Sequence, residues 1–142
     1  MRSLSPFLMF CGDQYGKAAE AIELYTSLFE GSRIVSIDRY GPDESEPEGT
    51  VRVAEFELAG HTVKAIDSAA PHQFTFTPAI SLWVDCSSRG ELERCAAALG
   101  DRGTMLMPIG NYGFSELFCW VADRYGVTWQ LNYQPPGDMP AS

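Results

Sequence analysis

The sequence has little of what marks nucleic-acid-binding, secreted or membrane proteins. It has 10 Lys and Arg residues and 19 Asp and Glu residues, which gives a net charge of −9. This charge argues against nucleic-acid binding, which needs a basic face. Its four cysteines form no CxxC pair, and the apolar run at residues 7–11 is too short for a signal peptide or a membrane span. We therefore expect a cytoplasmic protein with free thiols that binds neither nucleic acid nor membrane.

Several catalytic signatures are also missing. No GxGxxG motif or P-loop occurs, so we expect no glycine-rich cradle for S-adenosylmethionine or another nucleotide cofactor. No GxSxG nucleophile elbow of the hydrolase kind occurs either. The two histidines, His61 and His72, fall in a turn and a linker at no recognised ligand spacing, which predicts surface residues. The sequence therefore predicts no cofactor.

What the chain does have is the composition of one folded domain. It has 142 residues, of which 45% are hydrophobic and 20% are charged, as in ordinary globular proteins. A chain of this size buries ~70% of the surface that it exposes when unfolded. Short apolar or alternating runs predict strands at residues 7–11, 33–40, 50–58, 62–67, 79–86, 105–109, 114–122 and 127–132. The alternation changes phase near Ala54, which predicts a bulge there.

Two segments have the pattern of amphipathic helices. Residues 17–29 repeat apolar side chains every three or four positions and stop before Gly31. Ser88 and Glu91 form a capping box that opens a second helix, which ends at Gly100. Residues 41–49 contain two prolines, two glycines and four acids, which predicts a mobile loop. This loop is either a lid or a solvent-exposed connection without a further role. The order strand–helix–strand–strand–strand therefore occurs twice.

The most specific motifs lie near the C-terminus. Residues 110–114 read Gly-Asn-Tyr-Gly-Phe, residues 120–123 read Trp-Val-Ala-Asp, and residues 125–132 read Tyr-Gly-Val-Thr-Trp-Gln-Leu-Asn. Together with Leu-Met-Phe at 8–10 and Ala-Ile-Glu-Leu-Tyr at 21–25, they resemble the PhnB-like family of the vicinal-oxygen-chelate (glyoxalase/bleomycin-resistance/dioxygenase) superfamily. Members of that family often carry the label 3-demethylubiquinone-9 3-methyltransferase. The resemblance covers roughly residues 4–133.

The resemblance implies an α+β fold in which paired βαβββ modules form curved half-barrels around a cavity, in a homodimer. Residues 1–142 are then one domain, with module one at 4–68, a linker at 69–78, module two at 79–133 and a frayed tail at 134–142. Superfamily members hold a divalent metal with His and Glu side chains at repeated strand positions. Here those positions fall at about Ser5, Lys64, Ala79 and Gln130, and we expect no metal because these side chains are poor or repelling ligands.

Period-two alternation predicts which side chains point away from each helix. In residues 127–132 the inward set is Val127, Trp129 and Leu131, and the outward set is Thr128, Gln130 and Asn132. In residues 79–86 the inward set is Ile80, Leu82 and Val84, and the outward set is Ala79, Ser81 and Trp83. Residues 60–64 match 126–130 in register, which places Lys64 like Gln130. Asp67 and Asp123 end strands and predict turn or capping roles, although Asp67 could instead pair with Lys64.

These facings predict a small-molecule site with aromatic walls and a few polar groups, formed by Lys64, Trp83, Phe118, Trp120, Thr128, Gln130 and Asn132. The first hypothesis is a metal-independent protein that binds an aromatic or amphipathic ligand, with the acidic charge favouring cations. The alternative is an enzyme for a quinone-like or carbonyl substrate, in which Lys64 and Gln130 polarise an oxygen or a buried Lys64 acts as a base. A metalloenzyme with nonstandard ligands is a third hypothesis. In a further reading, the aromatics simply fill a closed half-barrel. Catalytic residues stay undefined.

Overall fold

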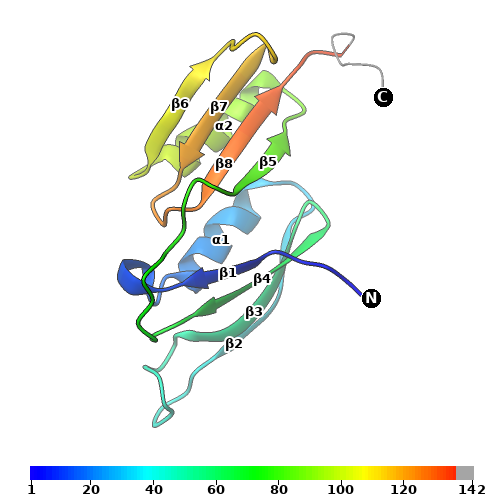
Figure 1. The fold of residues 1–142 in the computed structure, drawn as a ribbon. Coiled ribbons are helices and arrows are strands. Elements are labelled where there is room, and N and C mark those ends of the chain that lie inside the picture. The colour runs from blue at the N-terminus through cyan, green and yellow to red at the C-terminus, as the bar shows by residue number, and fades with distance from the viewer. Residues whose placement is uncertain (137–142) are drawn as a thin grey trace. The chain divides into compact units, whose positions relative to one another are not determined.

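Two compact units make up the chain in the computed structural model, which describes residues 1–136 (Figure 1). One unit is Met1–Thr75 and the other is Phe76–Ser142. Each has one α-helix and one four-stranded sheet, which confirms the α+β fold of two βαβββ modules. The boundary falls inside the predicted linker, and the predicted single domain stays a prediction.

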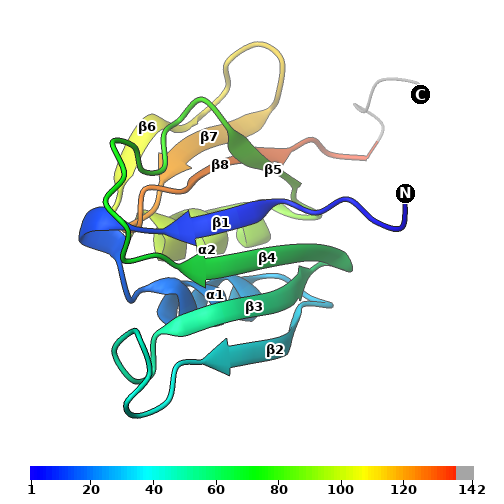
Figure 2. The ribbon, with the colours of Figure 1, turned by 60° about the horizontal axis from the view of Figure 1, so that its bottom comes forward.

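The first unit has the strands β1 (Phe7–Phe10), β2 (Arg33–Arg39), β3 (Val51–Leu58) and β4 (His61–Asp67), in the sheet order β1-β4-β3-β2. A short 3-10 turn, η1 (Gly12–Gln14), and the helix α1 (Ala18–Leu28) connect β1 to β2 (Figure 2). Strand β1 pairs parallel with β4, and the other pairs are antiparallel. A helix after the first strand is what a parallel return to the same sheet requires.

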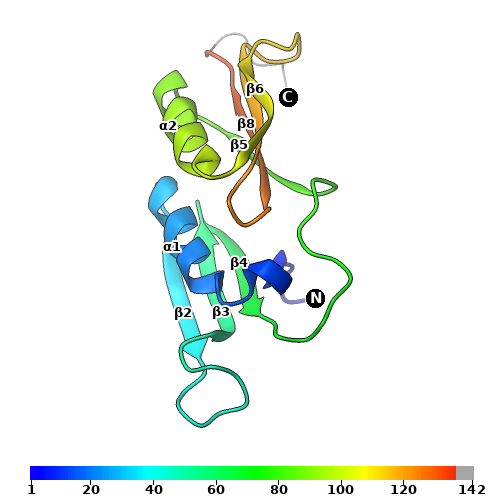
Figure 3. The same cartoon turned by 90° about the vertical axis from the view of Figure 1, so that its left-hand side faces the viewer.

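The second unit repeats this topology. Its strands are β5 (Ser81–Asp85), β6 (Thr104–Gly110), β7 (Leu117–Ala122) and β8 (Thr128–Tyr133), in the order β5-β8-β7-β6, with helix α2 (Arg89–Gly100) after β5. In both units the helix covers one face of the sheet only, as an edge-on view shows (Figure 3). Within the described residues, no helix is long and apolar enough to cross a membrane.

The helices form because their apolar side chains fall on one face, and that face is the core of each unit. Helix α1 buries Ala18, Ala21, Ile22 and Tyr25, and α2 buries Leu92, Cys95, Ala96 and Leu99. The predicted cap is confirmed in part, since the Ser88 hydroxyl accepts the Glu91 backbone N–H at 3.0 Å, while the Glu91 carboxylate accepts the backbone N–H of Ser87 at 2.8 Å. Under α2, strand β8 buries Trp129 and Leu131, as its alternation predicts.

Some expected strand ends differ in the structure. Residues 114–116 precede β7 because Gly113 turns the chain with a φ of 92° and the Ser115 hydroxyl donates to the Leu117 carbonyl oxygen at 2.8 Å. Ile80 was expected to face the helix, yet it precedes β5 and the residue is 76% exposed. The bulge of β3 is at Arg52, two residues before Ala54, since Asp38 and Arg39 pair with Val53 and Val51. Of the predicted tail, residues 137–142 lie outside the described residues, and Gln134 donates its side-chain N–H to the Phe114 carbonyl oxygen at 3.0 Å.

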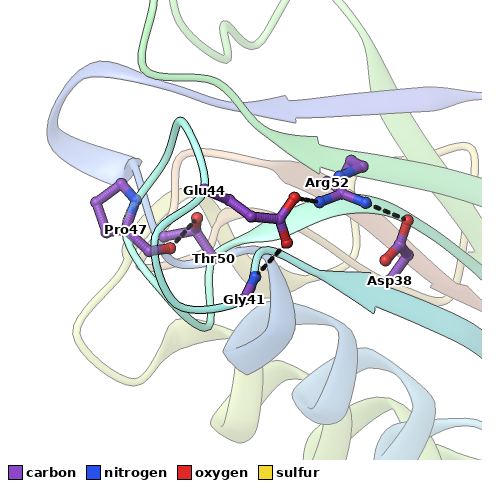
Figure 4. A network of polar contacts seen from close by, with 6 residues as sticks. All are labelled: Asp38, Gly41, Glu44, Pro47, Thr50 and Arg52. Carbon is purple, nitrogen blue, oxygen red and sulfur yellow. Dashed lines mark hydrogen bonds and ion pairs between the residues drawn. The ribbon is translucent and has the colours of Figure 1, made fainter.

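The bulge directs Arg52 toward the loop at 41–49 (Figure 4). Its guanidinium group contacts the Glu44 carboxylate, reaches Asp38 at 3.5 Å and lies 4.7 Å from the centre of the Tyr40 ring. Glu44 also accepts the Gly41 backbone N–H at 2.7 Å. These contacts attach the loop to β2 and β3, and its mobility stays a prediction.

Two buried carboxylates hold the turns together. Asp67 Oδ1 accepts the backbone N–H groups of Gly16 and Ala18 at 3.0 and 3.1 Å, and its Oδ2 accepts that of Val51 at 2.8 Å. Asp123 Oδ1 accepts the backbone N–H groups of Tyr125 and Val127, and its Oδ2 accepts the Trp129 indole N–H at 3.0 Å. The predicted turn and capping roles are confirmed, and Lys64 pairs with Glu55 rather than with Asp67.

Asp67→Ala should destabilise the protein by about 3 kcal/mol, because three N–H donors near the core lose a charged acceptor. Urea denaturation followed by circular dichroism measures this loss. The matched control is the exposed Asp13→Ala, which should change the free energy of unfolding by less than about 0.5 kcal/mol. Equal effects of the two substitutions would contradict the role given to Asp67.

Arg52→Met should loosen the 41–49 loop without unfolding the chain, because exposed ion pairs contribute little to global stability. Limited digestion with a glutamate-specific protease should cut at residues 44–48 severalfold faster, while the free energy of unfolding falls by about 1 kcal/mol or less. Arg33→Met, which removes the exposed Arg33–Glu57 pair of the same two strands, is the control. Unchanged cleavage in the Arg52 variant would refute the tether.

Candidate functional site

The face of the second sheet opposite α2, here called the helix-free face, gathers most of the predicted site residues. The register aligns three rows across the sheet: Ser81, Thr128, Ala122 and Thr104; Trp83, Gln130, Trp120 and Met107; and Asp85, Asn132, Phe118 and Gly110. Residues paired across strands share a face. Six predicted residues therefore lie together: Trp83, Phe118, Trp120, Thr128, Gln130 and Asn132.

Trp83 and Phe118 meet above the strand that separates them. Trp83 is on β5 and Phe118 on β7, with β8 between them, and their ring centroids are 5.8 Å apart. The two rings must therefore reach across the face of β8, which presents Gln130 and Asn132 at this point. Phe118 is 2% exposed, whereas Trp83 is 51% exposed.

The loop between β6 and β7 adds two further rings to Phe118. The Phe114 centroid lies 4.9 Å and the Tyr112 centroid 5.8 Å from that of Phe118, both in edge-to-face arrangements. Such geometry is favourable because the positive edge of one ring meets the negative face of another. Phe114 and Tyr112 are 55% and 39% exposed, so Phe118 is the buried base of an aromatic cluster with an open outer surface.

A chain of hydroxyl groups fixes Trp120 at the other end of the face. The Trp120 indole N–H donates to Ser81 Oγ at 3.1 Å, Ser81 Oγ lies 2.7 Å from Thr128 Oγ1, and Thr128 Oγ1 donates to the Ile80 carbonyl oxygen at 2.8 Å. When Ser81 donates to Thr128 and Thr128 donates to the Ile80 carbonyl oxygen, each hydroxyl uses its single hydrogen. Thr128 is 1% exposed, so its hydroxyl lies away from solvent. It positions Trp120 through its contact with Ser81.

The third row ends in a polar pair. Asp85 Oδ1 accepts the Trp83 indole N–H at 2.9 Å and the Asn132 side-chain N–H at 3.0 Å. A carboxylate only accepts hydrogen bonds, so this contact fixes the orientation of the Asn132 amide. The other end of that amide, Oδ1, is buried and has no hydrogen-bond partner within the described residues.

The equivalent row of the first unit is different in charge. Phe7, Lys64 and Glu55 align there as Trp83, Gln130 and Trp120 do in the second unit. Lys64 Nζ lies 4.0 Å from Glu55 Oε1, and the two side chains are 45% and 39% exposed. The buried lysine that the enzyme hypothesis invoked as a base is therefore not found. Its part in ligand binding stays a prediction.

The residues at the superfamily's metal positions do not fit a metal. Ala79 has no donor atom, Gln130 has only a neutral amide, and Lys64 brings a cation that already has Glu55 as its counter-ion. No group of three or more His, Cys, Asp or Glu side chains that could hold a metal occurs among residues 1–136. His61 is exposed at the start of β4, and His72 Nε2 lies 3.0 Å from Ser68 Oγ.

Buried thiols lie on the other side of the second sheet, toward α2. Desolvation raises the pKa of the Cys86 thiol to about 12, that of Cys119 to about 11, and that of Cys95 in the same direction. Nucleophilic attack and metal binding both need the thiolate. All four cysteines are free and buried, so these three thiols serve as core side chains rather than as chemistry at the site.

Comparison with known proteins agrees with the topology and the motifs. The sequence profile of the family described as 3-demethylubiquinone-9 3-methyltransferase matches residues 2–132. The chain belongs to this family. A PhnB protein from Bacillus cereus, a candidate 3-demethylubiquinone-9 3-methyltransferase by its description, is 47% identical over 94% of this chain and 100% of its own, with a TM-score of 0.88.

More distant structures share the fold alone. A Pseudomonas aeruginosa protein is 24% identical over 94% of this chain and 98% of its own, with a TM-score of 0.77. A glyoxalase-related enzyme from Fulvimarina pelagi is 16% identical over 99% of this chain and 96% of its own, with a TM-score of 0.54. No curated protein matches the chain. The predicted PhnB-like family is confirmed, and the glyoxalase-related structure supports the predicted fold.

Sequence reasoning missed three residues of the face: Asp85, Tyr112 and Phe114. Asp85 follows Trp83 by two positions in a strand, so period-two alternation could have placed it on the same face. Phe114 was assigned to a strand, and Tyr112 was noted only as part of a family motif. Their approach to Phe118 depends on the turn at Gly113, which strand periodicity does not encode.

The raised thiol pKa values predict a loss of stability in alkali. Above the ordinary thiol pKa near 9, the unfolded chain releases the Cys86 proton, while the folded chain keeps it up to about pH 12. The unfolded state then binds fewer protons, so the free energy of unfolding falls as pH rises between these values, by at most about 1.4 kcal/mol per pH unit per thiol. Urea denaturation at pH 8 and pH 10.5 should show a smaller loss in Cys86→Ala than in the unsubstituted protein. Identical losses would contradict the assignment.

Proposed function

We propose that the protein binds a planar aromatic small molecule on the helix-free face of the second sheet, without a metal. The observation that carries this proposal is the half-exposed Trp83, fixed through its indole N–H by Asp85 and in contact with the Phe118 ring. Exposed and fixed aromatic rings beside a few polar groups are what small-molecule sites offer, because stacking needs little further ordering.

The alternative of a filled half-barrel fits this face less well. Trp83, Phe114 and Tyr112 are 51%, 55% and 39% exposed, so their outer surfaces remain available for contact. Gln130 lies between the two tryptophans of its row and offers both an amide donor and an acceptor. A ligand with ring oxygens would find a hydrogen-bond partner there while its plane contacts indole.

The family description fits a ligand of this shape. It names a demethylubiquinone, and a benzoquinone ring is planar and carries oxygens at its rim. The proposal concerns binding, because the polar groups of the face are amides, hydroxyls and one carboxylate held by neutral donors. Lys64, on the first sheet, remains a proposed ligand contact, and a homodimer remains the proposed assembly.

Trp83→Leu should weaken binding of aromatic ligands about tenfold or more, since a central ring contact contributes strongly. A panel of planar quinones, phenols and aromatic amines is titrated by tryptophan fluorescence, with affinities checked by calorimetry. Quenching should come from Trp83 and Trp120, because Trp129 is 1% exposed on the helix side. Phe74→Leu, which removes an exposed ring outside both sheets, is the control.

Two results would count against the proposal. One is the absence of quenching by any member of the panel. The other is a change in molecular mass by light scattering when Trp83 is replaced, with ligand affinity unchanged, because the face would then serve assembly between copies of the chain.

A further inference from the structure

The third row of the helix-free face contains an acid without a cation. Asp85 takes part in no ion pair of the described residues, and its two hydrogen-bond donors, the Trp83 indole and the Asn132 amide, are neutral. Both donate to the same oxygen, Oδ1. The other carboxylate oxygen, Oδ2, therefore keeps its capacity to accept. Glu93 and Asp101 of this unit have arginine partners, whereas Glu91, like Asp85, accepts hydrogen bonds from neutral donors.

A second acceptor beside Asp85 is unsatisfied. Asn132 Oδ1 is buried without a hydrogen bond, and its orientation follows from the contact of Asn132 Nδ2 with the carboxylate. An unpaired buried carbonyl is unfavourable, which is why such groups almost always have partners in folded proteins. The Trp83 and Phe118 rings cross β8 where it presents Asn132, and this oxygen has almost no accessible surface, so a ligand group reaches it only when a neighbouring side chain moves.

From these contacts we infer that the ligand carries a cationic N–H donor group, and that Asp85 and Asn132 bind it beside the Trp83–Phe118 ring pair. The inference rests on the proposed aromatic-binding function and departs from the family description, because a quinone has no cationic N–H group. Two acceptor oxygens require a group with several N–H bonds, such as a primary ammonium or an amidinium. Aromatic faces attract the same cation, so the rings and the carboxylate act together.

The required N–H bonds separate this inference from general attraction of cations to an acidic protein. Net charge acts on any cation alike, and a quaternary ammonium would satisfy the rings and the carboxylate equally well. A quaternary ammonium has no N–H bond, so it leaves Asn132 Oδ1 without a partner. Discrimination between primary and quaternary amines is therefore the property that these contacts predict.

The test uses three probes with one ring and different head groups: phenethylamine, its N,N,N-trimethyl derivative and phenethyl alcohol. Calorimetry or two-dimensional NMR on the full chain at pH 7 should show phenethylamine binding about tenfold or more tighter than either of the others. In Asp85→Asn this advantage over the alcohol should disappear. Glu93→Gln removes the same charge on the far side of the unit and should change none of the three affinities.

The outcomes are distinguishable. If the trimethyl derivative binds the unsubstituted protein as tightly as phenethylamine, the inference is overturned whether or not the variant folds. Equal loss of amine affinity in both variants would also overturn it, because the effect would then be net charge. If no probe, including the alcohol, perturbs Trp83 or Phe118, the proposed aromatic site itself fails. Equal affinities of all three probes would support the aromatic site and contradict the inferred cationic group of the ligand.

Discussion

The alternation along β8 is the constraint on which the second unit depends. Trp129 and Leu131 must point toward α2, where they are almost fully buried, and the indole N–H of Trp129 is fixed by Asp123. A shift of one residue would bring an amide into this core and expose a tryptophan, so the register is strongly determined. Gln130 and Asn132 consequently face away from the helix, and the parallel partner β5 brings Trp83 and Asp85 beside them. The composition of the site is therefore a consequence of packing on the opposite side of the same strand.

This dependence explains how much of the molecule is predictable from its sequence. Helix α1 and the cap of α2 follow from spacing and from the pair Ser88 and Glu91, and the outward side chains of β8 follow from a period of two. The exposed position of Ile80 was missed because strand character alone does not show where pairing with β8 begins, which is at Ser81. The cluster around Phe118 was missed because Tyr112 and Phe114 reach it through a loop, and loop geometry depends on the positive φ of Gly113 rather than on periodicity.

The two units show how one topology can support different faces. The first has Phe7, Lys64 and Glu55 in the row where the second has Trp83, Gln130 and Trp120. Charge in the first row is balanced internally by the contact between Lys64 and Glu55. In the second unit the charge lies one row further along, on Asp85, where only neutral donors meet it. At two of the repeated positions that the family resemblance predicts for metal donors, this chain has the ammonium group of Lys64 and the amide of Gln130.

The contrast between Asp67 and Asp85 bears on what an unpaired carboxylate means in this protein. Asp67 is 5% exposed and uses both oxygens, because three backbone N–H groups near the start of α1 and β3 donate to it. Removing the Asp67 carboxylate takes the acceptor away from these three N–H groups, so its charge has a structural function. Asp85 is exposed and accepts from no backbone group among residues 1–136, and its Oδ1 orients the Trp83 indole and the Asn132 amide. A neutral amide could orient the same two donors, so the negative charge at this position is not required for the fold and is available to a ligand.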